Sequence, residues 1–282
     1  MEWYKFKFLK KFFLETTDWY VAWKKNTESV FKLIVNPKGY WLADPLLFTD
    51  EKNTYLFVEA FDKKEKKGKI GVFKFDGISF TDFKIVLEEP YHLSYPYVFE
   101  WNDNFFMIPE SSQNNSIDLF MSKDFPYRWE KKCRLLSGNF VDTSLYYVKE
   151  DKFNFITYDM NKNELVEGIL NMNNKELSIK SRREDSQYLL RPGGNFFYFE
   201  NKLCHAVQNN QFFYGQNLRI IDSEWNLITE VYPENIGLDN KKIYRRNHTY
   251  STEHDIEVID ISDYKFDFFK LMKRIWRKIW KK

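Results

Sequence analysis

The sequence predicts an all-β fold, a five-bladed β-propeller, on three observations. Five short segments, each bringing one polar group into an apolar strand, recur at nearly even spacing. They are Ala43-Asp44-Pro45, Leu93-Ser94-Tyr95-Pro96, Val141-Asp142-Thr143, Leu190-Arg191-Pro192 and Asn247-His248-Thr249. The steps from Asp44 to Ser94, Asp142, Arg191 and His248 are 50, 48, 49 and 57 residues by subtraction. One propeller blade of four short strands takes about 40–50 residues. Aromatic residues also make up 20% of the 282 residues, which suits β-strands.

Alternating apolar residues and turn residues place the strands of four blades. Blade one is expected at 42–48, 55–61, 68–76 and 79–87, and blade two at 93–100, 104–110, 116–122 and 129–136. Blade three is expected at 141–148, 152–159, 164–170 and 175–180. Blade four should start at 188–191, continue through 195–199 or 202–208, and end with 217–222 and 226–231. The first strand of each blade lines the central channel, so the five polar residues should converge on one axis.

Blade five is short by itself, with strands expected only at 247–252 and 257–261. The N-terminal segments 19–23 and 30–35 are strand-like and would complete it. That closure leaves no free sheet edge. The expected organisation is a basic, aromatic segment at 1–17, the propeller at 18–262 and a basic amphipathic helix at 263–282.

Positive charge is concentrated at the C-terminal end of the sequence. Residues 265–282 carry eight Lys or Arg and one Asp, with Leu271, Ile275, Trp276 and Ile279 at helical spacing. Such a helix binds an anionic membrane surface, so we expect a cytoplasmic protein, peripheral on the inner face of the membrane. The alternative is a helix packed on the propeller with its lysines in water. No run of 18 apolar residues is present. The body between the basic ends is acidic, which argues against nucleic-acid binding.

Several ordered blocks of the sequence resemble a known family. They are Tyr40–Phe48 with Leu56–Glu59, His92–Pro96 with Met107–Ser111, Asp124–Pro126 with Trp129, Leu190–Gly194 with Gln208 and Tyr214-Gly215, and His248–Tyr250 with Val258–Asp260. Together they resemble the N-terminal propeller of plant glucosamine inositolphosphorylceramide transferases and of related bacterial proteins of polysaccharide biosynthesis. The resemblance implies a propeller like that of glycoside hydrolase family 43. The chain departs from the family at Arg246-Asn247, where Gly-Thr is usual, and at His205–Val207, near which an Arg is common.

Hydrolases of the related propellers take one Asp from blade one, one Asp from blade three and an acidic Glu from blade four. The resemblance assigns the first two roles to Asp44 and Asp142, whereas blade four supplies Arg191. Because a guanidinium binds phosphate bidentately, Arg191 favours a sugar-nucleotide or sugar-phosphate donor. A phosphate leaving group needs little protonation, so this residue favours transfer to a glycan or lipid-linked acceptor over hydrolysis.

The expected catalytic residues are therefore four carboxylates. Asp44 is the proposed base, Glu110 or Glu59 a second carboxylate, and Asp142 a ligand of a sugar hydroxyl or a modulator of Asp44. The expected substrate-binding residues are His92, Ser94, Tyr95, Arg191, Gln208, Tyr214 and His248. No metal ligand is assigned, although a divalent cation near His248 remains open.

Each assignment has a structural alternative. Asp44 and His92 could cap turns, Arg191 could form a buried ion pair with Glu59 or Glu110, and the aromatic rings could pack in the core. Three functions follow: a glycosyltransferase of surface-polysaccharide or glycolipid biosynthesis, a glycoside hydrolase of the family-43 type, or a non-catalytic sugar-binding module.

Overall fold

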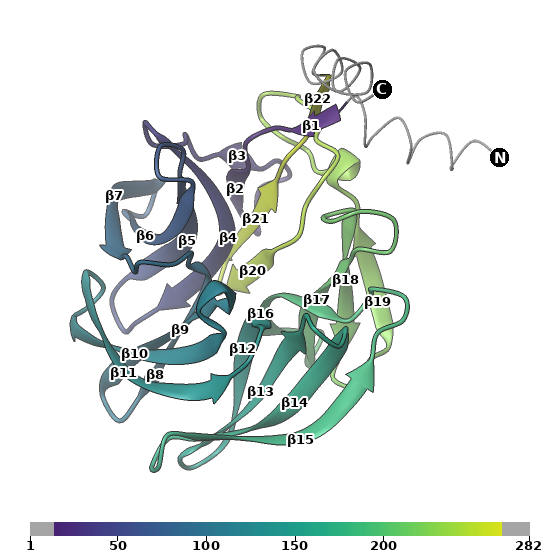
Figure 1. Ribbon diagram of the computed structural model, residues 1–282. Helices are drawn as coiled ribbons and strands as arrows, with labels where there is room; N and C mark the ends of the chain where they lie inside the picture. Colours follow the sequence, from purple (N-terminus) through teal and green to yellow (C-terminus); the bar gives the residue numbers. More distant parts are fainter. Residues whose placement is uncertain (1–13, 267–282) are drawn as a thin grey trace, which may run out of the picture.

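The computed structural model describes residues 14–266, which form an all-β, five-bladed propeller (Figure 1). Within this range, five four-stranded antiparallel sheets surround a central axis. A small two-stranded sheet joins β1 (Leu14–Thr16) to β22 (Tyr264–Phe266). The helical turns of the described range are the 3-10 turns η1 (Ser112–Asn114) and η2 (Pro233–Asn235). Across residues 14–266, no helix has the length and apolar character needed to cross a bilayer.

The first four blades follow the chain in order from the inner strand outward. Blade one contains β4 (Tyr40–Thr49), β5 (Thr54–Asp62), β6 (Lys67–Phe75) and β7 (Phe80–Leu87). Blade two contains β8 (Ser94–Trp101), β9 (Asn104–Ser111), β10 (Ser116–Asp124) and β11 (Arg128–Ser137). Blade three contains β12 (Phe140–Lys149), β13 (Lys152–Asp159), β14 (Glu164–Asn171) and β15 (Glu176–Glu184). Blade four contains β16 (Arg191–Phe199), β17 (Lys202–Asn209), β18 (Asn217–Asp222) and β19 (Leu227–Val231).

Blade five combines strands from both ends of the described chain. Its order is β20 (Tyr250–Glu253), β21 (Ile256–Ile261), β2 (Tyr20–Lys25) and β3 (Lys32–Leu33). Strand β2 pairs antiparallel with β21, from Tyr20 opposite Ile261 to Lys25 opposite Ile256.

Two sequence-based expectations are wrong in detail. The inner strand of blade four begins at Arg191 and runs through Gly193 and Gly194 to Phe199, so 188–191 is not its first strand. The two glycines and Pro192 hide this strand from an alternation pattern. Residues 264–266, expected to be part of the helix 263–282, form β22, and the rest of that helix lies outside the described residues.

The hydrophobic core lies between the blades, where neighbouring sheets pack face to face. Phe57, Met107 and Phe120 are fully buried between blades one and two. Further clusters lie between blades two and three, four and five, and five and one. Val21 and Trp23 of β2 belong to the cluster between blades five and one, so the N-terminal strand contributes to the core.

One irregularity recurs in the inner strands and positions the site. In β4, β8 and β12, the pairing with the second strand skips two residues. The first skipped residue is Asp44, Tyr95 or Asp142, with φ of 48°, 43° and 52°. These are β-bulges with a left-handed residue, which re-aim a side chain out of the pleat. The bulges make Tyr95, rather than Ser94, the structural equivalent of Asp44.

Candidate active site

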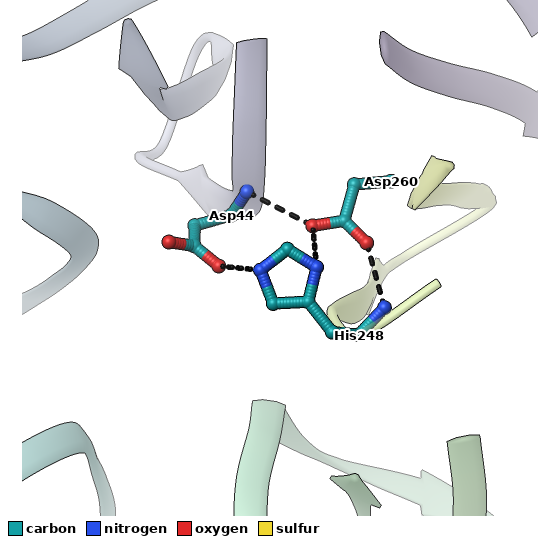
Figure 2. A group of neighbouring side chains, drawn as sticks. All are labelled: Asp44, His248 and Asp260. Carbon is teal, nitrogen blue, oxygen red and sulfur yellow. Dashed lines mark hydrogen bonds and ion pairs between the residues drawn. The ribbon is translucent and has the colours of Figure 1, made fainter. Parts of the chain in front are cut away.

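The first part of the site is an ion triad made by blades one and five (Figure 2). The Nε2 of His248 lies 3.0 Å from Oδ1 of Asp44, and its Nδ1 lies 2.9 Å from Oδ2 of Asp260. The backbone N–H of His248 donates to Oδ1 of Asp260 at 2.9 Å, and that of Asp44 donates to Oδ2 of Asp260 at 3.1 Å. Asp44 also accepts from the hydroxyl of Thr249 at 2.8 Å and from the N–H of Tyr95 at 3.3 Å. The triad is buried and links the first blade to the last.

Two carboxylates decide the charge of His248. Burial disfavours the charged ring, but Asp260 and Asp44 outweigh burial and raise the pKa of His248 to about 10. Burial also opposes ionisation of Asp44, but the charge and hydrogen bond of His248 hold the pKa of Asp44 below its ordinary value. His248 is therefore an imidazolium at neutral pH, paired on both sides.

Within residues 14–266, one group of side chains lies close enough together to be considered for a metal ion. It consists of Asp44, His248 and Asp260. A metal ligand must offer a ring nitrogen without its proton. In the arrangement described, both nitrogens of His248 lie within 3.0 Å of carboxylate oxygens as an ion triad. The same three side chains offer one imidazole nitrogen and carboxylate oxygens, which are ligand types that a divalent cation takes, so the cation that the sequence left open near His248 stays open.

The second part of the site is an ion pair made by blades three and four. The Nε of Arg191 donates to Oδ2 of Asp142 at 2.5 Å, and the amide of Gln208 donates to the same oxygen at 2.8 Å. Within residues 14–266, Oδ1 of Asp142 has no hydrogen bond. The Nη2 of Arg191 lies 3.8 Å from Oε2 of Glu110, so one guanidinium stands between carboxyls of blades two and three.

Glu110 differs from its neighbours in protonation. Burial, together with the negative charge of Asp142, raises the pKa of Glu110 to about 8. Oε1 of Glu110 accepts from the hydroxyl of Ser112 at 2.8 Å. At neutral pH, Glu110 is therefore a protonated carboxyl that can donate a hydrogen bond or a proton beside Arg191.

Glu59 and His92 occupy the junction of blades one and two. Nε2 of His92 lies 3.3 Å from Oε1 of Glu59, and Nδ1 of His92 accepts from the N–H of Gly68 at 2.9 Å. Burial lowers the pKa of His92, and burial with the charge of Asp44 raises the pKa of Glu59 well above its ordinary value. Both groups are thus neutral, and His92 accepts a hydrogen bond from the backbone of β6.

A pocket of about 220 Å³ opens beside the guanidinium of Arg191. Besides Arg191, its polar lining comes from Tyr158, Asn163, Asp185, Tyr188, Asn210 and Tyr214. The ring of Tyr214 lies 5.5 Å from the Arg191 guanidinium and 5.1 Å from the ring of His248, so it joins the two parts of the site. Arg191 lines this pocket, and Asp142 accepts a hydrogen bond from its Nε.

Tyr95 does not have the expected role. Its side chain is fully buried, and its hydroxyl bonds with Ser144 Oγ at 2.8 Å and with the carbonyl of Gly194 at 2.9 Å, while accepting from the N–H of Gly194 at 2.7 Å. These bonds join blade two to blades three and four across the channel. Tyr95 therefore closes the channel below the site and has no face for a sugar. Ser94 lies in the register position opposite Glu110.

Three residues of the site were missed by sequence reasoning. Asp260 occupies the second strand of blade five, as Glu59 and Glu110 do in blades one and two, and this shared position could have identified it. The ring of Trp19 lies 4.2 Å from that of His248 and 4.6 Å from the guanidinium of Arg246. No local pattern marks Trp19 or Arg246, because the blade closure brings them together.

The fold and this cluster define the class of protein: a five-bladed propeller with a charged site at one end of its channel. The chain belongs to the family described as glucosamine inositolphosphorylceramide transferase 1, N-terminal, whose model matches residues 15–267. This match confirms the resemblance predicted from the sequence blocks.

Curated relatives carry the same name. Glucosamine inositolphosphorylceramide transferase 1 of Oryza sativa subsp. indica is 28% identical over 235 residues, covering 77% of this chain and 31% of the rice protein. The Arabidopsis thaliana protein of that name is 32% identical over 109 residues, covering 38% of this chain and 14% of its own length. The chain thus spans about a third of the rice relative.

Solved structures share the fold at low identity. A family GH43_1 enzyme from Xanthomonas citri complexed with xylotriose has a TM-score of 0.62 at 7% identity, covering 83% of this chain and 89% of the enzyme. The native arabinanase of Bacillus subtilis has a TM-score of 0.55 at 11% identity, covering 78% of this chain and 94% of the arabinanase. This likeness confirms the five-bladed propeller predicted from the period.

Proposed function

We propose that the protein is a glycosyltransferase of surface-polysaccharide or glycolipid biosynthesis, which transfers a sugar from a phosphate-activated donor at the channel mouth. The observation that carries the proposal is Arg191, whose side chain lines a pocket between blades three and four. Family membership supports it, because the named relatives are transferases.

Arg191 is arranged to bind a phosphate while remaining paired. Oδ2 of Asp142 accepts a hydrogen bond from Nε of Arg191 at 2.5 Å. Nη2 of Arg191 is 3.8 Å from Oε2 of Glu110, and its Nη1 is 3.9 Å from the sulfur of Met160. A guanidinium carries five N–H donors, and within residues 14–266 the terminal nitrogens have these distant polar contacts beside the ring of Tyr214. A phosphate in the pocket would accept from Nη1 and Nη2, and the fixed Nε sets the plane of the fork.

The proton of the acceptor hydroxyl goes to an aspartate in this proposal. Both oxygens of Asp44 accept hydrogen bonds and its pKa is lowered, so Asp44 is a weak base. Asp142 keeps Oδ1 without a hydrogen bond in the described part of the chain. We therefore assign proton acceptance to Asp142 and assign to Asp44 the orientation of His248. The acceptor oxygen bonds to the anomeric carbon, and the phosphate leaves with the electron pair of the broken C–O bond.

The acceptor would approach from the end where the chain leaves the propeller. The ring of Tyr264 in β22 lies 5.3 Å from the guanidinium of Arg246, which stacks on Trp19 beside His248. Strand β22 therefore lies beside this part of the site, and the basic segment 265–282 begins within it in sequence. Binding of this basic segment to an anionic inner membrane surface would bring a lipid-linked acceptor to the site.

One observation favours the hydrolase as a second candidate. Hydrolysis needs a protonated carboxyl opposite an ionised one, and Glu110 with a pKa of about 8 provides the former. The acid expected in blade four is absent, but a neutral carboxyl of blade two stands beside the same Arg191.

The products of one reaction separate these functions. The purified protein is incubated with labelled nucleotide sugars and a membrane lipid extract, and label is followed into lipid, into free sugar and onto the protein. Incorporation of label into lipid supports the transferase. Loss of this incorporation in Arg191→Lys would assign the activity to the site that contains Arg191. Release of free sugar without incorporation overturns the proposal in favour of hydrolysis. Binding without turnover overturns it in favour of a sugar-binding module.

A further inference from the structure

A second pocket, of about 460 Å³, lies at the other end of the central channel. Each of the five inner strands contributes to it: Leu46 of β4, Tyr97 of β8, Leu145 of β12, Asn195 of β16 and Glu253 of β20 are examples. These residues follow Asp44, Tyr95, Asp142, Gly194 and Thr249 toward the opposite face.

The hydrogen bonds of Tyr95 separate the two pockets. Its hydroxyl bonds to Ser144 and Gly194, and Ser144 itself donates to the carbonyl of Gly194 at 2.9 Å. Gly194 also lies close to the backbone of blade five, because any Cβ there would lie 1.7 Å from the carbonyl oxygen of Tyr250. The far pocket is therefore a separate site and is independent of the proposed transferase function. Its volume is in the range of small-molecule sites.

The lining of the far pocket is aromatic and acidic. Two carboxylates, Glu100 and Glu253, line it, and none of the lining residues within 14–266 is basic. The aromatic members include Phe48, Tyr97, Tyr146, Phe153, Phe196 and Phe197. Aromatic faces with carboxylates and without a competing cation are the surroundings that attract organic cations.

Glu253 is a half-buried carboxylate of this pocket. Its carboxylate has no hydrogen bond or ion pair within residues 14–266, although burial raises its pKa to about 7. The neighbouring polar groups are already used. The amide of Asn195 donates to the carbonyl of Thr252 at 3.2 Å and accepts from its N–H at 3.3 Å, and the hydroxyl of Tyr97 donates to the carbonyl of Leu145.

We propose that the far pocket binds an organic ammonium ion, with Glu253 as its counter-ion and the surrounding aromatic rings enclosing its apolar groups. The ligand class is an amine or quaternary ammonium group on a small apolar body. Each partner of this ligand is present: an unpaired carboxylate, π-faces for the cationic head and a cavity of suitable size.

The test compares two probes of the same shape. Choline and its neutral carbon analogue, 3,3-dimethylbutan-1-ol, are titrated into the full-length protein at about pH 8.5, where Glu253 is ionised. Binding is followed by NMR. Choline should bind at least about tenfold more tightly than the neutral analogue, and its binding should shift resonances of Tyr97 and Phe196.

Two variants complete the design. Glu253→Gln should weaken choline binding about tenfold or more, whereas Asp255→Asn, an exposed carboxylate of the same turn, should leave it unchanged. Equal binding of the two probes to the wild-type protein would overturn the proposal without any variant. Unchanged choline affinity in a folded Glu253→Gln protein would overturn it as well.

Discussion

At the residue scale, the protonation of each acid in the site depends on whether a cation lies within hydrogen-bond distance of it. Asp44 and Asp260 share the imidazolium of His248, and Asp142 holds the guanidinium of Arg191. Glu59 and Glu110 lack a cation at that range, and burial raises the pKa of each. The same channel thus contains paired cations beside neutral acids, a combination suited to binding an anion.

Replacing Glu110 by Gln separates transfer from hydrolysis. The substitution exchanges one neutral group for another of the same shape in the folded protein, so the fold should be retained. Transfer from a phosphate donor should keep activity within about tenfold, because its leaving group needs no acid, whereas acid-dependent hydrolysis should fall about 10²–10⁴-fold. The measurement is the initial rate with labelled donor, with exposed Glu150→Gln as the control. A loss of transfer as large as that expected for hydrolysis would contradict the proposed chemistry.

Replacing Tyr95 by Phe tests its structural role. The change removes the hydroxyl that bonds Ser144 and both backbone groups of Gly194. The buried N–H of Gly194 is left without this partner, whereas Ser144 and the carbonyl of Gly194 keep their mutual hydrogen bond. We expect a loss of about 1–3 kcal/mol in unfolding free energy, measured by urea denaturation. The exposed Tyr198→Phe is the control and should change stability by less than about 0.5 kcal/mol. Equal stability of the two variants would refute the role assigned to Tyr95.

The sequence predicted most site residues but not their relations. Asp44, Asp142, Arg191 and His248 follow from the period, and the structure brings them together in two adjoining ion clusters. The partner of His248 was missed, because Asp260 lies on a second strand and the period concerns first strands. Tyr95 was assigned to the substrate because a sequence cannot show that a bulge turns its ring across the channel.

At the element scale, strand positions in regular blades were predictable and those in irregular ones were not. Alternation placed β4 through β15 closely, because each strand has one face toward a neighbouring blade. It failed at β16, where Pro192, Gly193 and Gly194 interrupt the apolar pattern and widen the bulge. The pairing of β2 with β21 links residues more than 200 positions apart, and only the missing strands of blade five indicated it.

A charge placed in β2 tests the contribution of this strand. Val21 is fully buried and packs between blades five and one, whereas Val35 is 86% exposed just after β3. Val21→Asp should destabilise the protein by several kcal/mol, since a buried unpaired charge has no compensation, and Val35→Asp should change stability by less than about 0.5 kcal/mol.

Deletion of residues 1–36 should abolish folding. A deletion protein with the same melting transition as wild type would show that blade five does not need these strands.

At the scale of the whole molecule, the ion triad makes stability depend on pH. The pKa of His248 is raised from 6.5 to about 10, so the folded state holds this proton more tightly than the unfolded state. The stabilisation is fully present below about pH 6.5 and is lost as the pH rises through about 10.

The unfolding free energies of wild type and His248→Gln are to be compared at about pH 6 and about pH 10 by urea denaturation. Their difference should shrink as the pH rises. A difference that is constant over this range would contradict the paired imidazolium.

Glu110 affects stability at lower pH. Its pKa is raised from 4.5 to about 8, so between these values the carboxyl is ionised in the unfolded state and protonated in the folded state. Stability therefore falls as the pH rises from about 4.5 to about 8, and Glu110→Gln should remove that loss.

The central claim, that Arg191 binds the phosphate of an activated sugar, is tested most directly by calorimetric titration of inorganic pyrophosphate. Pyrophosphate is the group shared by nucleotide-sugar donors. We predict measurable binding to the wild-type protein and a loss of about tenfold or more in Arg191→Lys, which keeps the charge but lacks the planar fork. Unchanged affinity in a folded Arg191→Lys protein, or no binding to the wild type, would contradict the account.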